Sequence, residues 1–167
     1  IGDGPDMDKV RAAAGPNVTV LGFQDDATLV DHMQRARAFV FAAEEDFGIT
    51  PVEAQACGTP VIAYGRGGSL ETVRGRGDPA RRTGVFFEAL MAAVGAVAAL
   101  PVTIAAETCR RHAEDFAPER FRERFAAEVE RAWAAFHGEP DATTVPVSAS
   151  VSVPQSVPRA ISCPDLS

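Results

Sequence analysis

The sequence has few cysteines, fewer basic than acidic residues, and no apolar run of membrane-spanning length. Its three cysteines, Cys57, Cys109 and Cys163, have neither paired metal-ligand spacing nor an even disulfide count, which favours a reducing cytoplasm. The 16 basic and 23 acidic residues give a formal net charge of -7, which argues against nucleic-acid binding through phosphate contacts. The most apolar run, residues 90–100, is shorter than the roughly 20 residues that a membrane-spanning helix needs.

No signal-peptide pattern is visible either. We therefore expect a cytoplasmic protein, and peripheral association of the full-length protein with the inner face of the membrane stays open. With 46% hydrophobic and 23% charged residues, the chain has the composition of one globular domain.

Short β-rich runs alternate with helical patterns, which predicts an α/β fold: a Rossmann-like parallel sheet with flanking helices. The predicted strands are 18–21, 38–41, 61–64 and 84–87, with the end of another at residue 1. The predicted helices are 6–14, 27–35, 51–57, 70–74, 90–99, 103–115 and a long helix from residue 118.

Local residue types set the expected helix ends. Asp26 is predicted to cap the helix over 27–35, and Gly58 to follow the end of the helix over 51–57. Pro51 is predicted at the first helical position, where its missing N–H would be unpaired anyway.

The C-terminal third divides into a helix and a tail. Apolar residues recur at helical spacing in the long helix and are expected to form a buried stripe. The stripe consists of Phe121, Phe125, Val129, Ala132 and Phe136. From Gly138 the chain is rich in Pro, Ser, Val and Thr, which predicts a disordered tail over 138–167 after a domain over 1–137.

The strongest chemical signal is a pair of glutamates, Glu45 and Glu53, eight positions apart around Gly48. Gly48 lets the backbone come close to a ligand, and the N–H groups of Ile49 and Thr50 at a helix start are suited to a diphosphate. A loop glutamate and a helix glutamate can then reach hydroxyl groups on different parts of one elongated ligand. This is the layout of a sugar-nucleotide pocket.

The segment resembles the E-x7-E motif of retaining GT-B-fold glycosyltransferases of family 4. Further segments look like the C-terminal donor-binding domain of that family, in its order: 1–5, 17–23, 54–63, 67–73 and 83–87. Residues 45–63 are similar to bacterial mannosyltransferases of surface polysaccharide assembly, which implies GDP-mannose as the donor substrate. The resemblance also implies hexosyl transfer without a metal, a cofactor or a protein nucleophile, in which the protein positions the reactants and stabilises charge.

The resemblance implies a role for each site residue. Glu45 would hold hydroxyls of the donor sugar, with Glu44 as a competing candidate, and Glu53 would hold the ribose hydroxyls. The other implied contacts are Gly48, Ile49 and Thr50 to the diphosphate and sugar, Gly22 and Phe23 to the base, and Gly67 and Gly68 in a loop beside the pocket. A surface acid, a plain helix start and a simple turn are the alternatives without a ligand.

In the resembled family, a glycan or lipid-linked acceptor binds an N-terminal domain, and an arginine and a lysine just before the matching segment hold the diphosphate. The sequence contains neither, so we expect an N-terminally truncated domain that binds a nucleotide-sugar donor and does not transfer sugar alone. A non-catalytic nucleotide-sugar binding module is the alternative function, and a related epimerase is a third.

Other reactive residues have simpler expected roles. Cys57 is expected to be a small core residue and not a nucleophile. His32, His112 and His137 are scattered, and surface positions are expected for them. The arginines of 74–82 could attract an anion, although a solvated basic loop is the favoured interpretation.

Overall fold

The structure is a computed structural model that describes residues 1–88, 95 and 104–137. Three strands, β1 (Phe39–Phe41), β2 (Val61–Tyr64) and β3 (Gly84–Phe87), form one sheet in the order β1-β2-β3. Both pairings are parallel, with Phe39 opposite Val61 and Val61 opposite Gly84. The predicted α/β fold with a parallel sheet is confirmed.

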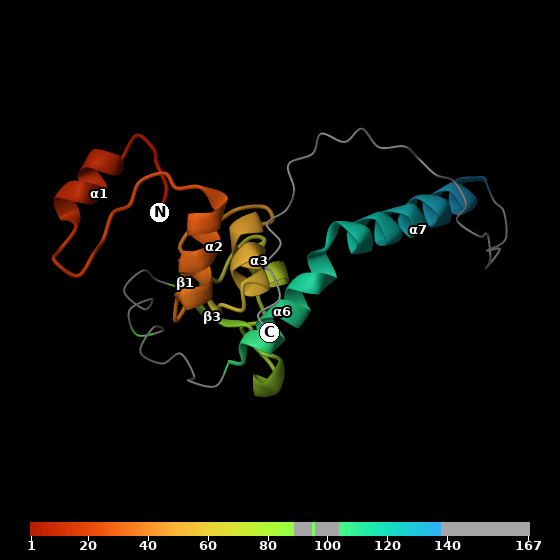
Figure 1. The fold of residues 1–167 in the computed structure, drawn as a ribbon. Helices are drawn as coiled ribbons and strands as arrows, with labels where there is room; N and C mark the ends of the chain where they lie inside the picture. The colour runs from red at the N-terminus through yellow and green to blue at the C-terminus, as the bar shows by residue number, and fades with distance from the viewer. Residues whose placement is uncertain (89–94, 96–103, 138–167) are drawn as a thin grey trace.

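Helices precede, connect and follow these strands. They are α1 (Met7–Ala13), α2 (Asp26–Arg35), α3 (Ile49–Ala56), α4 (Ser69–Thr72), α6 (Ala106–Ala113) and α7 (Pro118–His137), with short 3-10 turns η1 (Pro79–Arg81) and η2 (Glu114–Phe116). Figure 1 shows α2, α3 and α6 gathered around the sheet, whereas α1 and α7 extend away from it on opposite sides. In the described ranges, no helix combines the length and apolar character needed to span a bilayer. The helix expected over 90–99, except residue 95, and the tail expected over 138–167 lie outside the described residues.

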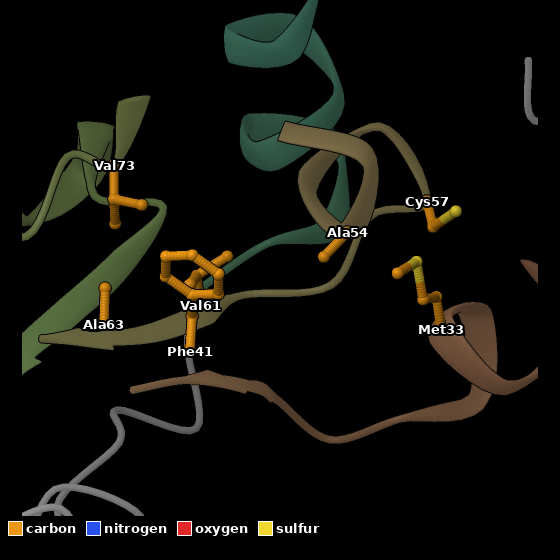
Figure 2. Close-up of a cluster of buried hydrophobic side chains, with 7 residues drawn as sticks. All are labelled: Met33, Phe41, Ala54, Cys57, Val61, Ala63 and Val73. Atoms are coloured by element: carbon orange, nitrogen blue, oxygen red, sulfur yellow. The ribbon is translucent and has the colours of Figure 1, made fainter. Parts of the chain in front are cut away.

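The core lies around the central strand. Val61, Ile62 and Ala63 of β2 are fully buried, as a parallel strand covered on both faces requires. On one face of the sheet, side chains from the strands pack with side chains from the helices, as Figure 2 shows. The members of this cluster are Met33, Phe41, Ala54, Cys57, Val61, Ala63 and Val73. Cys57 is therefore a core residue, as expected.

The prediction of a strand over 18–21 is wrong. Residues 18–21 have no strand geometry, and the only backbone hydrogen bond between residues 18–22 and the N-terminal loop joins Gly2 N to Gly22 O at 2.8 Å. A strand needs a hydrogen-bonded neighbour along its length. The β-rich composition of this segment does not supply one.

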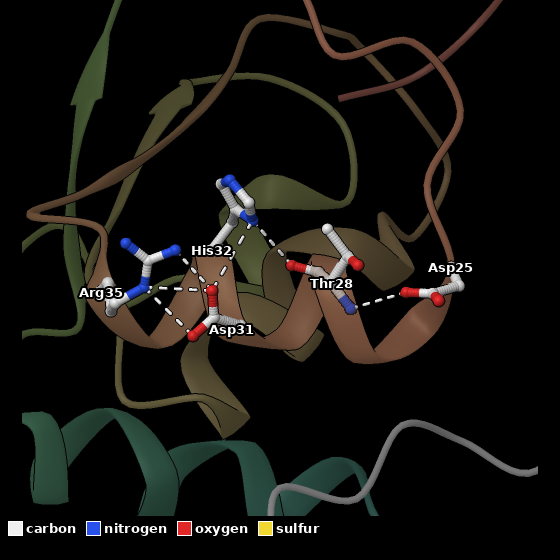
Figure 3. A network of polar contacts seen from close by, with 5 residues as sticks. All are labelled: Asp25, Thr28, Asp31, His32 and Arg35. Carbon is white, nitrogen blue, oxygen red and sulfur yellow. Dashed lines mark hydrogen bonds and ion pairs between the residues drawn. The ribbon is translucent and has the colours of Figure 1, made fainter.

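Two helix starts differ from the sequence expectation. Asp25, and not Asp26, caps α2, because the helix begins one residue earlier and the Asp25 carboxylate accepts from the Thr28 N–H at 2.8 Å. Figure 3 shows this cap beside the Asp31–Arg35 pair on the same helix. Pro51 is the third residue of α3 and not the first; its missing N–H is still among those without an intrahelical partner.

The prediction that the apolar stripe of α7 is buried is also wrong. Its large members, Phe121, Phe125, Val129 and Phe136, are 48% to 84% exposed. The helix has the amphipathic pattern, but it points away from the sheet, so no described residue covers its apolar face (Figure 1).

Candidate donor-binding site

Two loops meet at the edge of the sheet formed by the carboxyl ends of the strands. One loop joins β1 to α3 and contains residues 45–48, which we call the donor loop. The other joins β2 to α4 and contains Gly67 and Gly68. The N–H of Gly68 donates to the carbonyl oxygen of Glu45 at 2.7 Å, so the structure brings these predicted site residues together. Ligands of open parallel sheets bind at this edge.

The two glycines allow this close approach. A Cβ atom at Gly67 would lie 2.5 Å from the Glu45 carbonyl oxygen, and one at Gly68 would lie 2.5 Å from Cα of Phe47. Gly67 also has a positive φ of 60°, which side chains with a Cβ rarely adopt. The glycine pair therefore forms a turn and also lets the backbone of the donor loop pack directly against it.

The donor loop ends at the start of α3. Gly48 is the N-cap residue, with φ 79° and ψ 77°, and no side chain caps this helix. Across the described residues, the N–H groups of Ile49 and Thr50 donate to no acceptor. Unpaired N–H groups at the positive end of a helix form a binding site for an anion such as a phosphate.

The two glutamates differ in environment. Glu45 is exposed on the donor loop, whereas Glu53 lies half-buried on the second turn of α3. Burial raises the pKa of Glu53, and the negative charge of Asp26 raises it further. Neither glutamate has a hydrogen bond or ion pair to another described side chain. A half-buried carboxylate is costly without donors, and ligand hydroxyls are suitable donors.

Gly22 and Phe23 are not gathered with the donor loop. Gly22 lines a pocket of about 450 Å³ whose lining residues all come from 1–22, and Phe23 is 79% exposed. Because residues 18–21 form no strand, the expected location of this pair at a strand end does not hold. The base contact assigned to it stays a prediction.

A second pocket, of about 600 Å³, lies beside the basic loop that was expected to be solvated. Its walls include Glu71, Arg74, Arg81 and Phe86. Arg74 is paired with Asp115 at 3.2 Å, and Arg81 has no ion pair within the described residues. We call this the basic pocket; it is the competing location for an anionic ligand.

Two buried polar side chains behind the donor loop, those of Gln55 and His112, were not predicted from the sequence. Gln55 Nε2 donates to the carbonyl oxygens of Pro51 and Thr72, each at 2.9 Å, and His112 Nε2 lies 3.2 Å from the same Thr72 oxygen. The expected surface position of His112 is wrong: it is only 5% exposed, because it shares the buried face of α6 with Cys109. The helical spacing of these two residues was the available signal.

The environment of His112 favours its neutral form. Burial lowers the pKa of His112, and the positive charge of Arg74 lowers it further, against an opposing contribution from Asp115. Burial raises the pKa of the Cys109 thiol to about 11, so that thiol is protonated at neutral pH. The Cys109 thiol therefore lacks the properties of a nucleophile.

The described residues contain no group of three or more histidine, cysteine, aspartate or glutamate side chains that could hold a metal ion. The site thus consists of a helix N-terminus, two carboxylates and a glycine-backed loop at the ligand-binding edge of a parallel sheet. The fold is that of a Rossmann-like domain, and these features suit a ligand that carries both a phosphate and hydroxyl groups.

Comparison with known families agrees with this class. The family model described as "Glycosyl transferases group 1" matches residues 1–100 of the 167-residue chain. The chain therefore belongs to the group 1 glycosyltransferase family. No curated protein matches the chain. Membership supports glycosyl transfer as the general activity, with a nucleotide-sugar donor and an acceptor as substrates.

Proposed function

We propose that the chain binds the donor for a retaining hexosyl transfer in polysaccharide or glycoconjugate synthesis, and that the donor is GDP-mannose. The observation that carries the proposal is the meeting of the donor loop, the start of α3 and the Gly67–Gly68 loop at one edge of the sheet. The family match supports the transferase class. The choice of mannose and guanine rests on the sequence resemblance of residues 45–63.

The proposed donor lies across the start of α3. Its diphosphate receives hydrogen bonds from the N–H groups of Ile49 and Thr50, and the helix dipole stabilises its negative charge. Glu53 accepts hydrogen bonds from both ribose hydroxyls. Glu45 accepts from hydroxyls of the sugar and is the residue that we assign to the transfer step.

In the proposed reaction, the bond between the sugar anomeric carbon and the diphosphate oxygen breaks, and an acceptor hydroxyl forms a new bond from the same face. The acceptor proton passes to the departing diphosphate. The residues of the site position the donor and stabilise the leaving group. Under the GT-B resemblance, a glycan or lipid-linked acceptor binds a domain outside these residues, so we propose that the 167-residue chain alone binds without transferring.

Calorimetric titration of the chain with GDP and UDP tests the binding role. A dissociation constant of about 1 mM, equivalent to roughly 4 kcal/mol, is expected for a half-cleft. Glu53→Gln should abolish measurable GDP binding, because the loss of a charged hydrogen bond, about 1.5–3 kcal/mol, raises a millimolar dissociation constant more than tenfold, whereas Glu45→Gln should leave binding near normal. Glu71→Gln, an exposed glutamate beside the basic pocket, is the matched control.

Equal losses for Glu45→Gln and Glu53→Gln would overturn the assignment of the two carboxylates. A full-length protein that binds GDP tightly and transfers no sugar to any acceptor would instead identify the chain as a non-catalytic binding module.

A further inference from the structure

We propose that Phe116 is a positioning residue for the donor site: its ring holds Phe47 and so fixes the donor loop. The proposal rests on the donor-binding function above and extends the site to the C-terminal segment after α6. Phe116 ends η2, far along the chain from the donor loop, yet its ring meets the Phe47 ring edge-to-face with centroids 5.8 Å apart.

Phe47 depends on this contact. Its side chain is 44% exposed, and Phe116 supplies its only aromatic contact within the described ranges. The Phe47 carbonyl oxygen lies 3.5 Å from Thr72 Oγ1, at the outer limit of a hydrogen bond, while that hydroxyl has the Gly68 carbonyl oxygen at 3.1 Å. The Phe116 ring therefore restrains the half-exposed Phe47 side chain, in addition to the hydrogen bond from Gly68 that holds the same loop at Glu45.

Phe116 itself is held firmly from behind. Its ring packs edge-to-face on His112 at 5.2 Å, and His112 Nε2 lies 3.2 Å from the Thr72 carbonyl oxygen. Asp115, the preceding residue, pairs with Arg74 at 3.2 Å and ties η2 to the end of α4. A ring fixed on one side and in contact with a loop on the other can set the position of that loop.

The position of Phe47 matters for the ligand because Gly48 follows it directly. The conformation of Gly48 aims the N–H groups of Ile49 and Thr50, which are the proposed diphosphate donors. A donor loop that samples other positions binds more weakly, in proportion to the time it spends away from the competent one.

The test uses three variants of the full chain and two measurements below the unfolding transition. Phe116→Leu removes the ring, and Phe116→Tyr keeps it. Phe39→Leu is the matched control, because Phe39 is also half-buried against the core and begins β1, whereas the donor loop follows the other end of that strand. The measurements are amide hydrogen exchange at Gly68, whose N–H donates to the Glu45 carbonyl oxygen of the donor loop at 2.7 Å, and the dissociation constant for GDP. Aromatic pairs of this geometry predict a change of about three- to tenfold.

In Phe116→Leu, exchange at Gly68 and the GDP dissociation constant should both rise by that factor, and Phe116→Tyr should restore both. Phe39→Leu should change neither, although it lowers the unfolding midpoint. Equal effects of Phe116→Leu and Phe39→Leu on exchange at Gly68, or no effect of Phe116→Leu, would overturn the positioning role. If the wild-type chain binds neither GDP nor UDP, the proposed function fails, and the exchange measurement still decides whether Phe116 holds the loop.

Discussion

Replacing Gly68 with alanine tests how closely the Gly67–Gly68 loop packs against the donor loop. Gly68 has φ −60° and ψ −20°, a helical conformation that alanine adopts without strain. Alanine would therefore stabilise by about 0.4–1 kcal/mol through the unfolded state if there were space for its Cβ. In the structure, the three atoms nearest to that Cβ would be backbone atoms: Cα and N of Phe47 at 2.5 and 2.6 Å, and the Asp46 carbonyl oxygen.

Backbone atoms cannot rotate away as a side chain does, so the donor loop must move. Overpacking of this kind costs about 1–3 kcal/mol, and after the favourable unfolded-state contribution we expect a net loss of about 1–2 kcal/mol in the free energy of unfolding. Urea unfolding followed by circular dichroism measures it, with Gly4→Ala as the control because no atom lies within 4 Å of a Cβ there. GDP binding should weaken in Gly68→Ala. A Gly68→Ala chain as stable as wild type, or more stable, would refute the argument that the two loops are in close contact.

Three further predictions follow from the charges. Folding raises the pKa of Glu53, so ionisation of this carboxyl group destabilises the fold as pH rises above 4.5. Glu53→Gln should therefore have a higher urea midpoint than wild type at pH 7, and the same midpoint at pH 4. Folding lowers the pKa of His112, so its contribution to stability is present above pH 6.5 and is lost as pH falls below that value. The urea midpoint of wild type should therefore decline between pH 7 and pH 5, and His112→Gln should make this decline smaller. Sugar transfer by a full-length enzyme should survive excess EDTA, because the helix start at Ile49 and Thr50 is proposed to stabilise the leaving diphosphate; a loss of activity that magnesium restores would overturn that role.

The sequence predicted those parts of the fold that depend on local pattern. The runs 61–64 and 84–87 became β2 and β3 with the predicted bounds, and parallel strands place their following loops at one edge whatever the remaining details. The segment 18–21 is also rich in β-formers, but it forms no strand, since pairing depends on a neighbour that composition does not specify.

The side chains that pack behind the donor loop were less predictable for the same reason. Phe116 meets Phe47, and His112 meets the Thr72 carbonyl, only after α6 packs on α3, and no spacing in the sequence records that packing. The amphipathic pattern of α7 likewise indicates that one face is apolar, but it does not say what covers that face.

The central claim is that a nucleoside diphosphate binds at the start of α3. Backbone amide chemical shifts of the ¹⁵N-labelled chain during titration with GDP test it most directly. We predict that the amides of Gly48, Ile49 and Thr50 shift together and saturate, while those around Arg74 and Arg81 of the basic pocket do not. Saturable shifts confined to the basic pocket, with the start of α3 unchanged, would contradict the account.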